Sequence, residues 1–252
     1  MCRHIAYIGP PVTLGEVLLA PEHALVHQSY RPRHQRHGRI NADGFGVGWY
    51  APDHREEPAR YRTVKPMWTD RTFASIAGVI STSALLGAVR NASVGFPIEE
   101  TGCAPFTRGK WLFSLNGVVH AFRDGIGSEL RAELPSTLLD TLEGVVDTEV
   151  VFLMAISRIA TGVDPAEALE DVIRTVFERT TGRLNLLLTD GSRIVATAAG
   201  DSLFVRTTGE SVVVASEPYD DDEVWQPVLD GHLVDATVGA FEIRAMAGVP
   251  PS

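Results

Sequence analysis

The sequence contains few of the residues on which several protein classes depend. Its two cysteines, Cys2 and Cys103, are too few for a disulfide framework or for a zinc site built from thiolates. Only two basic residues are lysines, Lys65 and Lys110, and the net charge is −10. A nucleic-acid-binding protein would carry a basic surplus instead. We therefore expect no nucleic-acid partner.

Long apolar segments are also absent. The longest unbroken apolar run covers residues 150–156 and is far shorter than the ~20 residues that a helix needs to cross a bilayer. The N-terminus has no apolar stretch as long as the core of a signal peptide. We therefore expect no membrane association and a cytoplasmic location, where Cys2 would remain a free thiol.

The order of the expected elements indicates the fold class. Strands dominate the first half, helices are expected at 135–142, 147–160 and from 164, and the last third consists of strands separated by turns. We find no internal repeat and no linker that would divide the 252 residues, so we expect one domain over residues 2–252. This order predicts an α+β fold of two mainly antiparallel sheets with helices outside, in four layers.

The most suggestive residue for chemistry follows the initiator Met1. Removal of Met1 would leave Cys2 with a thiol and a free α-amino group. The thiol is a nucleophile, and an amine with an ordinary pKa of about 7.7–8.0 can accept its proton near neutral pH. The apolar stretch that follows predicts a buried strand. On these residues alone, a small buried cysteine without a catalytic role is the more ordinary interpretation.

Residues 23–40 interleave four histidines with four arginines. These are His23, His27, His34, His37, Arg31, Arg33, Arg36 and Arg39. The histidine spacing matches no metal-binding pattern, and the arginines would repel a cation, so we expect no metal here. The segment fits a basic loop over an anionic or polar substrate, or simply a solvated loop.

Glycines alternate at Gly44, Gly46 and Gly48. No helix follows them, as a dinucleotide-binding fingerprint would require, so we expect no nucleotide and no other cofactor. Glycines on one face of a strand indicate instead that another backbone or a ligand comes close.

Two expected strands continue into polar residues. The strand at 84–89 leads into Arg90-Asn91-Ala92-Ser93, and the strand at 111–115 leads into Asn116-Gly117. Taken alone, Arg90 could be a surface residue at a strand end, and an Asn-Gly pair between apolar runs is normally a hairpin turn. Asp147 could likewise be the N-cap of the helix that begins there.

In combination these features have a recognisable order. An N-terminal Cys, Arg-x-Ala-Ser after one strand, Asn-Gly after another and Asp-Thr-Glu at a helix start occur in this sequence from Cys2 to about Ala215. This pattern resembles the class II glutamine amidotransferases, a family of N-terminal-nucleophile hydrolases. The resemblance implies an αββα sandwich and an enzyme that hydrolyses the γ-glutamyl amide of a small molecule.

The resemblance also implies a role for each matching residue. Cys2 would form a γ-glutamyl thioester, with its own amine as the base through a water. The side-chain amide of Asn116 and the backbone N–H of Gly117 would form the oxyanion hole. Arg90 would pair with the α-carboxylate of the substrate, and Asp147 would hold its α-ammonium group.

The leaving-group side departs from the family pattern. Many relatives have Arg-Trp-Ala-Thr-His where this chain has Arg90-Asn91-Ala92-Ser93-Val94, so an aromatic residue and a histidine are missing. Ser93 remains a candidate substrate-binding residue. Aromatic or acidic residues elsewhere could bind a cationic leaving group, with Tyr30, Trp49 and residues 220–223 as candidates.

A narrower resemblance links the chain to the stand-alone amidohydrolases of bacterial ergothioneine synthesis. It is carried by Met1-Cys2-Arg3-His4, Gly9-Pro10-Pro11, Gln28-Ser29-Tyr30, Arg36-His37-Gly38 and Asn41-Ala42-Asp43-Gly44. It implies hydrolysis of γ-glutamyl-hercynylcysteine sulfoxide to glutamate and hercynylcysteine sulfoxide. A glutaminase subunit that supplies ammonia to a separate synthase is the alternative, and a catalytically silent binding protein is a third.

Overall fold

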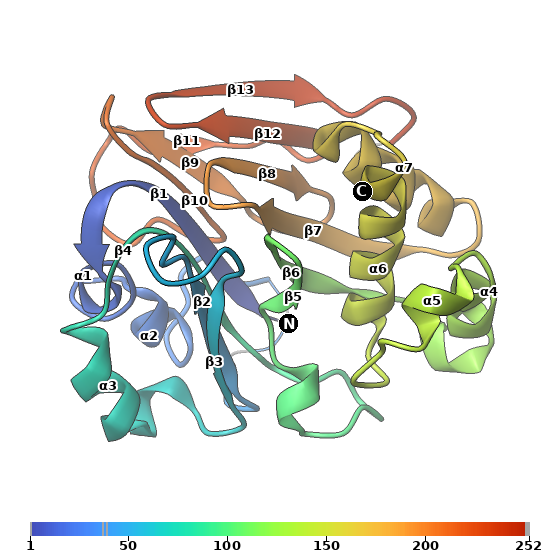
Figure 1. Ribbon diagram of the computed structural model, residues 1–252, viewed down its shortest axis with the longest axis horizontal. Helices are drawn as coiled ribbons and strands as arrows, with labels where there is room; N and C mark the ends of the chain where they lie inside the picture. Colours follow the sequence, from blue (N-terminus) through green and yellow to red (C-terminus); the bar gives the residue numbers. More distant parts are fainter. Residues whose placement is uncertain (1, 37, 39, 250–252) are drawn as a thin grey trace.

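A computed structural model describes residues 2–36, 38 and 40–249, and two antiparallel sheets form its centre (Figure 1). One sheet has seven strands in the order β11-β9-β10-β1-β4-β2-β3, and the other has six in the order β13-β12-β8-β7-β6-β5. Helices cover the outer face of each sheet, with α1–α3 and α6–α7 on opposite sides of the molecule. The predicted α+β fold in four αββα layers is confirmed.

The elements follow the chain in a simple order. The seven-stranded sheet contains β1 (Arg3–Thr13), β2 (Phe45–Trp49), β3 (Ala59–Thr63), β4 (Ser81–Val89), β9 (Phe204–Thr207), β10 (Val212–Ala215) and β11 (Gln226–Pro227). The six-stranded sheet contains β5 (Phe106–Arg108), β6 (Trp111–Val119), β7 (Gly182–Thr189), β8 (Arg193–Ala198), β12 (His232–Thr237) and β13 (Ala240–Ala245). The α-helices are α1 (Leu14–Leu18), α2 (Leu25–Gln28), α3 (Arg71–Ala77), α4 (Ile126–Ala132), α5 (Ser136–Leu139), α6 (Asp147–Ala160) and α7 (Pro165–Phe177).

β1 lies inside its sheet, between β4 and β10, and is buried on both faces. Ala6 and Ile8 belong to the core between the sheets, whereas Ile5 and Tyr7 pack in the core under α1–α3. Because side chains alternate along a strand, His4 points between the sheets, where its ring contacts Ser114 of β6. The start of β1, directly after Cys2, therefore lies where the two sheets meet.

The hairpin interpretation of Asn116-Gly117 is wrong, and so is the predicted strand end at residue 115. β6 continues to Val119, with Gly117 opposite Leu184 of β7. A Cβ atom on Gly117 would lie 1.8 Å from the carbonyl oxygen of Arg183. The glycine is needed because the two backbones approach closely.

The helical region differs from expectation in part. α6 begins at the predicted residue, but the helix expected at 135–142 is the four-residue α5, and α4 before it was not anticipated. Both short helices pack against the core beneath α6 through Leu130, Leu138 and Leu139. Within the described ranges, no helix is both long and apolar enough to span a membrane.

The glycines around β2 mark close contacts, as predicted. A Cβ on Gly46 would lie 2.3 Å from the carbonyl oxygen of Ala104, and one on Gly48 would lie 2.6 Å from the Leu112 side chain. Both neighbours belong to the chain around β5 and β6, so the two sheets meet here without room for a side chain.

We expect Gly46→Ala to lower the free energy of unfolding by about 1–3 kcal/mol, because the added methyl group meets a backbone carbonyl that cannot rotate away. Urea unfolding followed by circular dichroism measures the change. Gly78→Ala is the control, because an added Cβ there has no neighbour closer than 3.9 Å. Equal stabilities for the two variants would contradict this account of β2.

Candidate active site

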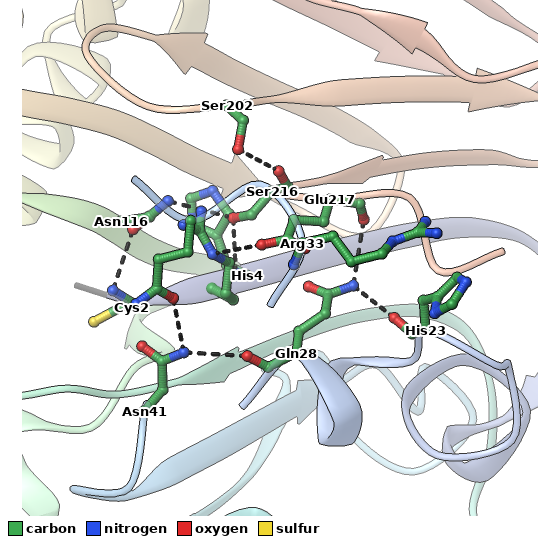
Figure 2. Close-up of polar contacts among 12 residues, drawn as sticks. Cys2, His4, His23, Gln28, Arg33, Asn41, Asn116, Ser202, Ser216 and Glu217 are labelled. Carbon is green, nitrogen blue, oxygen red and sulfur yellow. Dashed lines mark hydrogen bonds and ion pairs between the residues drawn. The ribbon is translucent and has the colours of Figure 1, made fainter. Parts of the chain in front are cut away.

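One pocket collects most of the residues that the sequence singled out. Cys2, Arg90, Ser93, Gly117 and Asp147 all line it. They come from the residue before β1, the loop after β4, the last part of β6 and the start of α6. The sixth candidate, Asn116, lies directly beside Cys2 (Figure 2). The structure thus brings residues from four separate segments to one place.

Arg90 follows β4 and is 7% exposed. Its Nη2 donates a hydrogen bond to the carbonyl oxygen of Pro97 at 3.0 Å, while the buried Nη1 has no partner among the described residues. The guanidinium lies against Gly102, where a Cβ would come within 2.7 Å of Nη2. The side chain is therefore held from two sides and keeps donors for an anion in the pocket, which suits a carboxylate.

The segment Asn41-Ala42-Asp43-Gly44 holds the loop that carries Arg90. The backbone N–H of Asp43 donates to the carbonyl oxygen of Arg90 at 2.9 Å, and the N–H of Arg90 donates to the carbonyl oxygen of Gly44 at 2.8 Å. The Asp43 carboxylate accepts a further bond from the N–H of Ala92 at 2.8 Å. A segment known only as part of a resemblance thus has a structural role beside the pocket.

Asp147 is the first residue of α6, and Val146 is the N-cap, so the N-cap interpretation of Asp147 is wrong. Its carboxylate accepts hydrogen bonds from the N–H groups of Val119 and Thr148, at 2.9 and 2.8 Å. Burial nevertheless raises the pKa of Asp147 above its ordinary value. A cation placed beside it would stabilise the ionised form, because an opposite charge offsets the loss of hydration.

The N–H of Gly117 faces the same pocket. N–H groups alternate between the two edges of a strand, and that of Val119 points to Asp147 rather than to β7. The N–H of Gly117, two residues earlier, therefore points to the same edge, where β5 pairs only with residues 111–113. It is available to an oxygen atom near Cys2.

Asn116 is fully buried and connects both sheets. Its Oδ1 accepts a hydrogen bond from the backbone nitrogen of Cys2 at 3.2 Å, and its Nδ2 donates to Ser216 Oγ at 3.5 Å (Figure 2). The amide nitrogen, which the sequence assigns to the oxyanion hole, is thus directed at Ser216. The amide oxygen is the atom that faces Cys2.

A buried ionic contact lies behind Cys2. Arg3 is fully buried, and its Nε lies 3.0 Å from a carboxylate oxygen of Glu217. The other carboxylate oxygen accepts a hydrogen bond from the N–H of Arg33 at 2.6 Å. Sequence reasoning missed Ser216 and Glu217, because a Ser-Glu pair after a short strand is typical of an ordinary loop.

His4 and His37 both belong to the motifs that carry the narrower resemblance, and the structure describes the first of them. Burial, with a further contribution from the charge of Arg3, lowers the pKa of His4 to about 3, so His4 is neutral at physiological pH. His37 lies outside the described residues, and so does Met1, whose removal would free the amine of Cys2. His4 therefore contributes packing and a hydrogen bond, not charge.

Cys103 fits the expected role of a buried bystander. It is fully buried, its Sγ lies 3.5 Å from the carbonyl oxygen of Thr63, and burial raises its pKa to about 11. A thiol that stays protonated is a poor nucleophile. Cys2 is thus the reactive candidate of the two.

The residues suggested for a cationic leaving group do not reach the pocket lining. Trp49 packs against the core under α1–α3, and Tyr30 contacts Trp68, with ring centroids 5.5 Å apart. The acidic residues Asp220 and Asp221 form ion pairs with Arg206 and Arg33 at 2.7 and 2.6 Å. These acidic side chains already have basic partners.

In the described part of the chain, one group of side chains has the spacing of a metal site, formed by Glu22, His23 and Asp221. Of the three interleaved histidines that the structure describes, only His23 takes part. Arg33 also binds the Asp221 carboxylate, and its positive charge opposes a cation there. This arrangement gives no support to a metal site in the histidine-rich segment.

Comparison with known proteins agrees with the geometry. The family model for class II glutamine amidotransferases matches residues 22–209. A γ-glutamyl-hercynylcysteine sulfoxide hydrolase from Mycolicibacterium smegmatis is 43% identical over 236 residues, which cover 93% of this chain and 95% of that protein. A protein of the same name from Mycobacterium tuberculosis is 39% identical over 98% of this chain and 97% of its own length.

A solved structure is also similar. A glutamine aminotransferase class-II domain protein from Silicibacter pomeroyi covers 98% of this chain and 100% of its own, with a TM-score of 0.72 and 24% identity, which shows a shared fold. The family model spans most of the sequence, and the M. smegmatis relative matches nearly end to end. The chain belongs to the class II glutamine amidotransferases.

Proposed function

We propose that this protein hydrolyses γ-glutamyl-hercynylcysteine sulfoxide to glutamate and hercynylcysteine sulfoxide, with Cys2 as the nucleophile. The observation that carries the proposal is the convergence of Cys2, Arg90, Gly117 and Asp147 on one pocket. The names of the relatives at 43% and 39% identity support this choice of substrate.

The charges in the pocket suit the glutamyl half of such a substrate. The α-carboxylate would bind Arg90, whose Nη1 has no other described partner, and the α-ammonium group would bind the Asp147 carboxylate. The pocket offers about 40 Å³, while a single water needs roughly 10–15 Å³. A space of this size cannot also hold the bulky leaving group, which would lie outside it.

Acyl transfer would proceed through a thioester. The Cys2 sulfur attacks the δ-carbonyl carbon of the glutamyl group, and the thiol proton passes to the α-amine of Cys2. The N–H of Gly117 stabilises the negative charge on the carbonyl oxygen. When the C–N bond breaks, the α-ammonium returns the proton to the leaving nitrogen. Water then hydrolyses the thioester, which releases glutamate and regenerates the thiol.

The first test is turnover by the purified protein, whose mass spectrum shows whether Met1 is lost. We expect glutamate release from γ-glutamyl-hercynylcysteine sulfoxide to be much faster than from glutamine, and abolished by Cys2→Ala. Cys103→Ala is the matched control and should retain activity. Faster turnover of glutamine would favour an ammonia donor for a separate synthase. Retained Met1 with no turnover of either substrate would favour a silent binding protein.

Arg90→Lys should raise KM by roughly 10- to 150-fold with a smaller effect on kcat. The change replaces a planar fork by a point charge and loses charged hydrogen bonds worth about 1.5–3 kcal/mol. Steady-state kinetics measure it. Arg108→Lys, an exposed arginine of β5, should leave KM unchanged. If both variants bind substrate like the wild type, Arg90 does not hold the carboxylate.

Substrate binding should weaken in acid because Asp147 must be ionised to hold an ammonium group. Burial raises the pKa of Asp147 in the empty enzyme, so KM should rise at a higher pH than an ordinary aspartate, with a pKa of about 3.9, would cause. KM measured across the acid range tests this. Asp147→Asn should raise KM throughout and remove the acid-dependent increase, whereas Arg90→Lys should retain it. An unchanged profile in Asp147→Asn would refute the assignment.

A further inference from the structure

Ser216 lies at the junction of the nucleophile strand and the Asn116 strand. It follows β10 and is fully buried. Its backbone N–H donates to the carbonyl oxygen of His4 at 2.9 Å, and its Oγ accepts from the N–H of His4 at 3.0 Å. Its carbonyl oxygen accepts a bond from Ser202 Oγ at 2.8 Å. These contacts fix Ser216 against β1, two residues from Cys2.

The Ser216 hydroxyl also holds the amide end of Asn116. A side-chain amide has one accepting end and one donating end. Ser216 Oγ accepts from Nδ2 of Asn116, so Oδ1 points the opposite way and accepts from the Cys2 nitrogen (Figure 2). The N–H donor at Cys2 selects this orientation, because a flipped amide would turn its NH₂ group toward that N–H, whereas the Ser216 hydroxyl can either donate or accept. Ser216 contributes a fixed partner for the far end of the amide.

We propose that Ser216 is a positioning residue that orients the Asn116 amide and, through it, the α-amine of Cys2. This inference rests on the proposed function, in which the α-amine accepts the thiol proton. Its lone pair must point to the thiol, and a hydrogen bond from the amine to Asn116 Oδ1 restricts its rotation. Without the Ser216 hydroxyl, the amide nitrogen loses its described partner, and the amine loses a firmly held acceptor.

The surrounding charges do not supply this orientation. On the first sheet, Arg3 is paired with Glu217, and His4 is neutral. Arg90 after β4 and Asp147 on α6 line the pocket on its substrate side. Asn116 is thus the described hydrogen-bond acceptor of the Cys2 nitrogen, and Ser216 is the described acceptor of its amide nitrogen.

Ser216→Ala tests the proposal, with Ser114→Ala as the matched control. Ser114 is also a fully buried serine, lies on the same strand as Asn116, and binds the His4 ring instead of the amide. We expect Ser216→Ala to lower kcat by about tenfold, because the variant loses one hydrogen bond that positions the catalytic groups. KM should change little. Ser114→Ala should lower kcat much less.

A second readout needs no substrate. The rate of Cys2 alkylation by iodoacetamide, followed by mass spectrometry of the Cys2 peptide after loss of Met1, reports ionisation of the thiol and amine against pH. Ser216→Ala should shift the midpoint of this profile, and Ser114→Ala should not. Ser216→Thr, which keeps a hydroxyl, should retain the wild-type midpoint. In an Asn116→Ala background, Ser216→Ala should add no further shift.

The outcomes separate two kinds of failure. Equal effects of Ser216→Ala and Ser114→Ala on both readouts, or lost stability without a shifted midpoint, would overturn the positioning role. If Ser216→Ala does not fold, Ser216→Cys replaces it, because a thiol keeps the shape but is a weak acceptor. A wild type that cleaves neither substrate would refute the proposed function, while the alkylation profile would still test Ser216.

Discussion

The candidate site is organised around the hydrogen bond between the Cys2 nitrogen and Asn116 Oδ1, which joins the residue before β1 in one sheet to β6 in the other. A chain terminus is normally the least ordered part of a domain. Here β1 lies inside its sheet, and Arg3 to Ile8 are buried. The fold therefore includes the residues directly after Cys2 in its core, which under the proposed function fixes the position of the nucleophile.

The layered fold also explains why the pocket residues come from distant parts of the sequence. β1, β4 and β6 meet where the sheets face each other, and α6 covers the second sheet beside them. Each contributes a residue at or near an end, where backbone groups are not all used by neighbouring strands. Arg90 and Asp147 are thus supported by secondary structure while their charged groups remain open to the pocket.

The sequence predicted the layers, most strands, the long helices and five residues of one pocket. These follow from local patterns and from four motifs in a fixed order. It could not predict that Asn116-Gly117 continues a strand, because the reason is the Arg183 carbonyl in a strand more than sixty residues away. Ser216 and Glu217 were missed for the same reason. Their importance comes from contacts with Asn116 and Arg3, not from their own neighbourhood.

The empty pocket gives a physical basis for choosing a γ-glutamyl substrate. It contains a guanidinium nitrogen without a described partner and a buried carboxylate whose pKa is raised by burial. Under the proposed function, a glutamyl group supplies an anion to the first and a cation to the second. A ligand lacking either charge would leave one buried group unpaired, and sites built around buried polar groups reject such analogues by about 10⁴–10⁵. Selectivity for the glutamyl half would then come from the Arg90 guanidinium and the Asp147 carboxylate, independently of the leaving group.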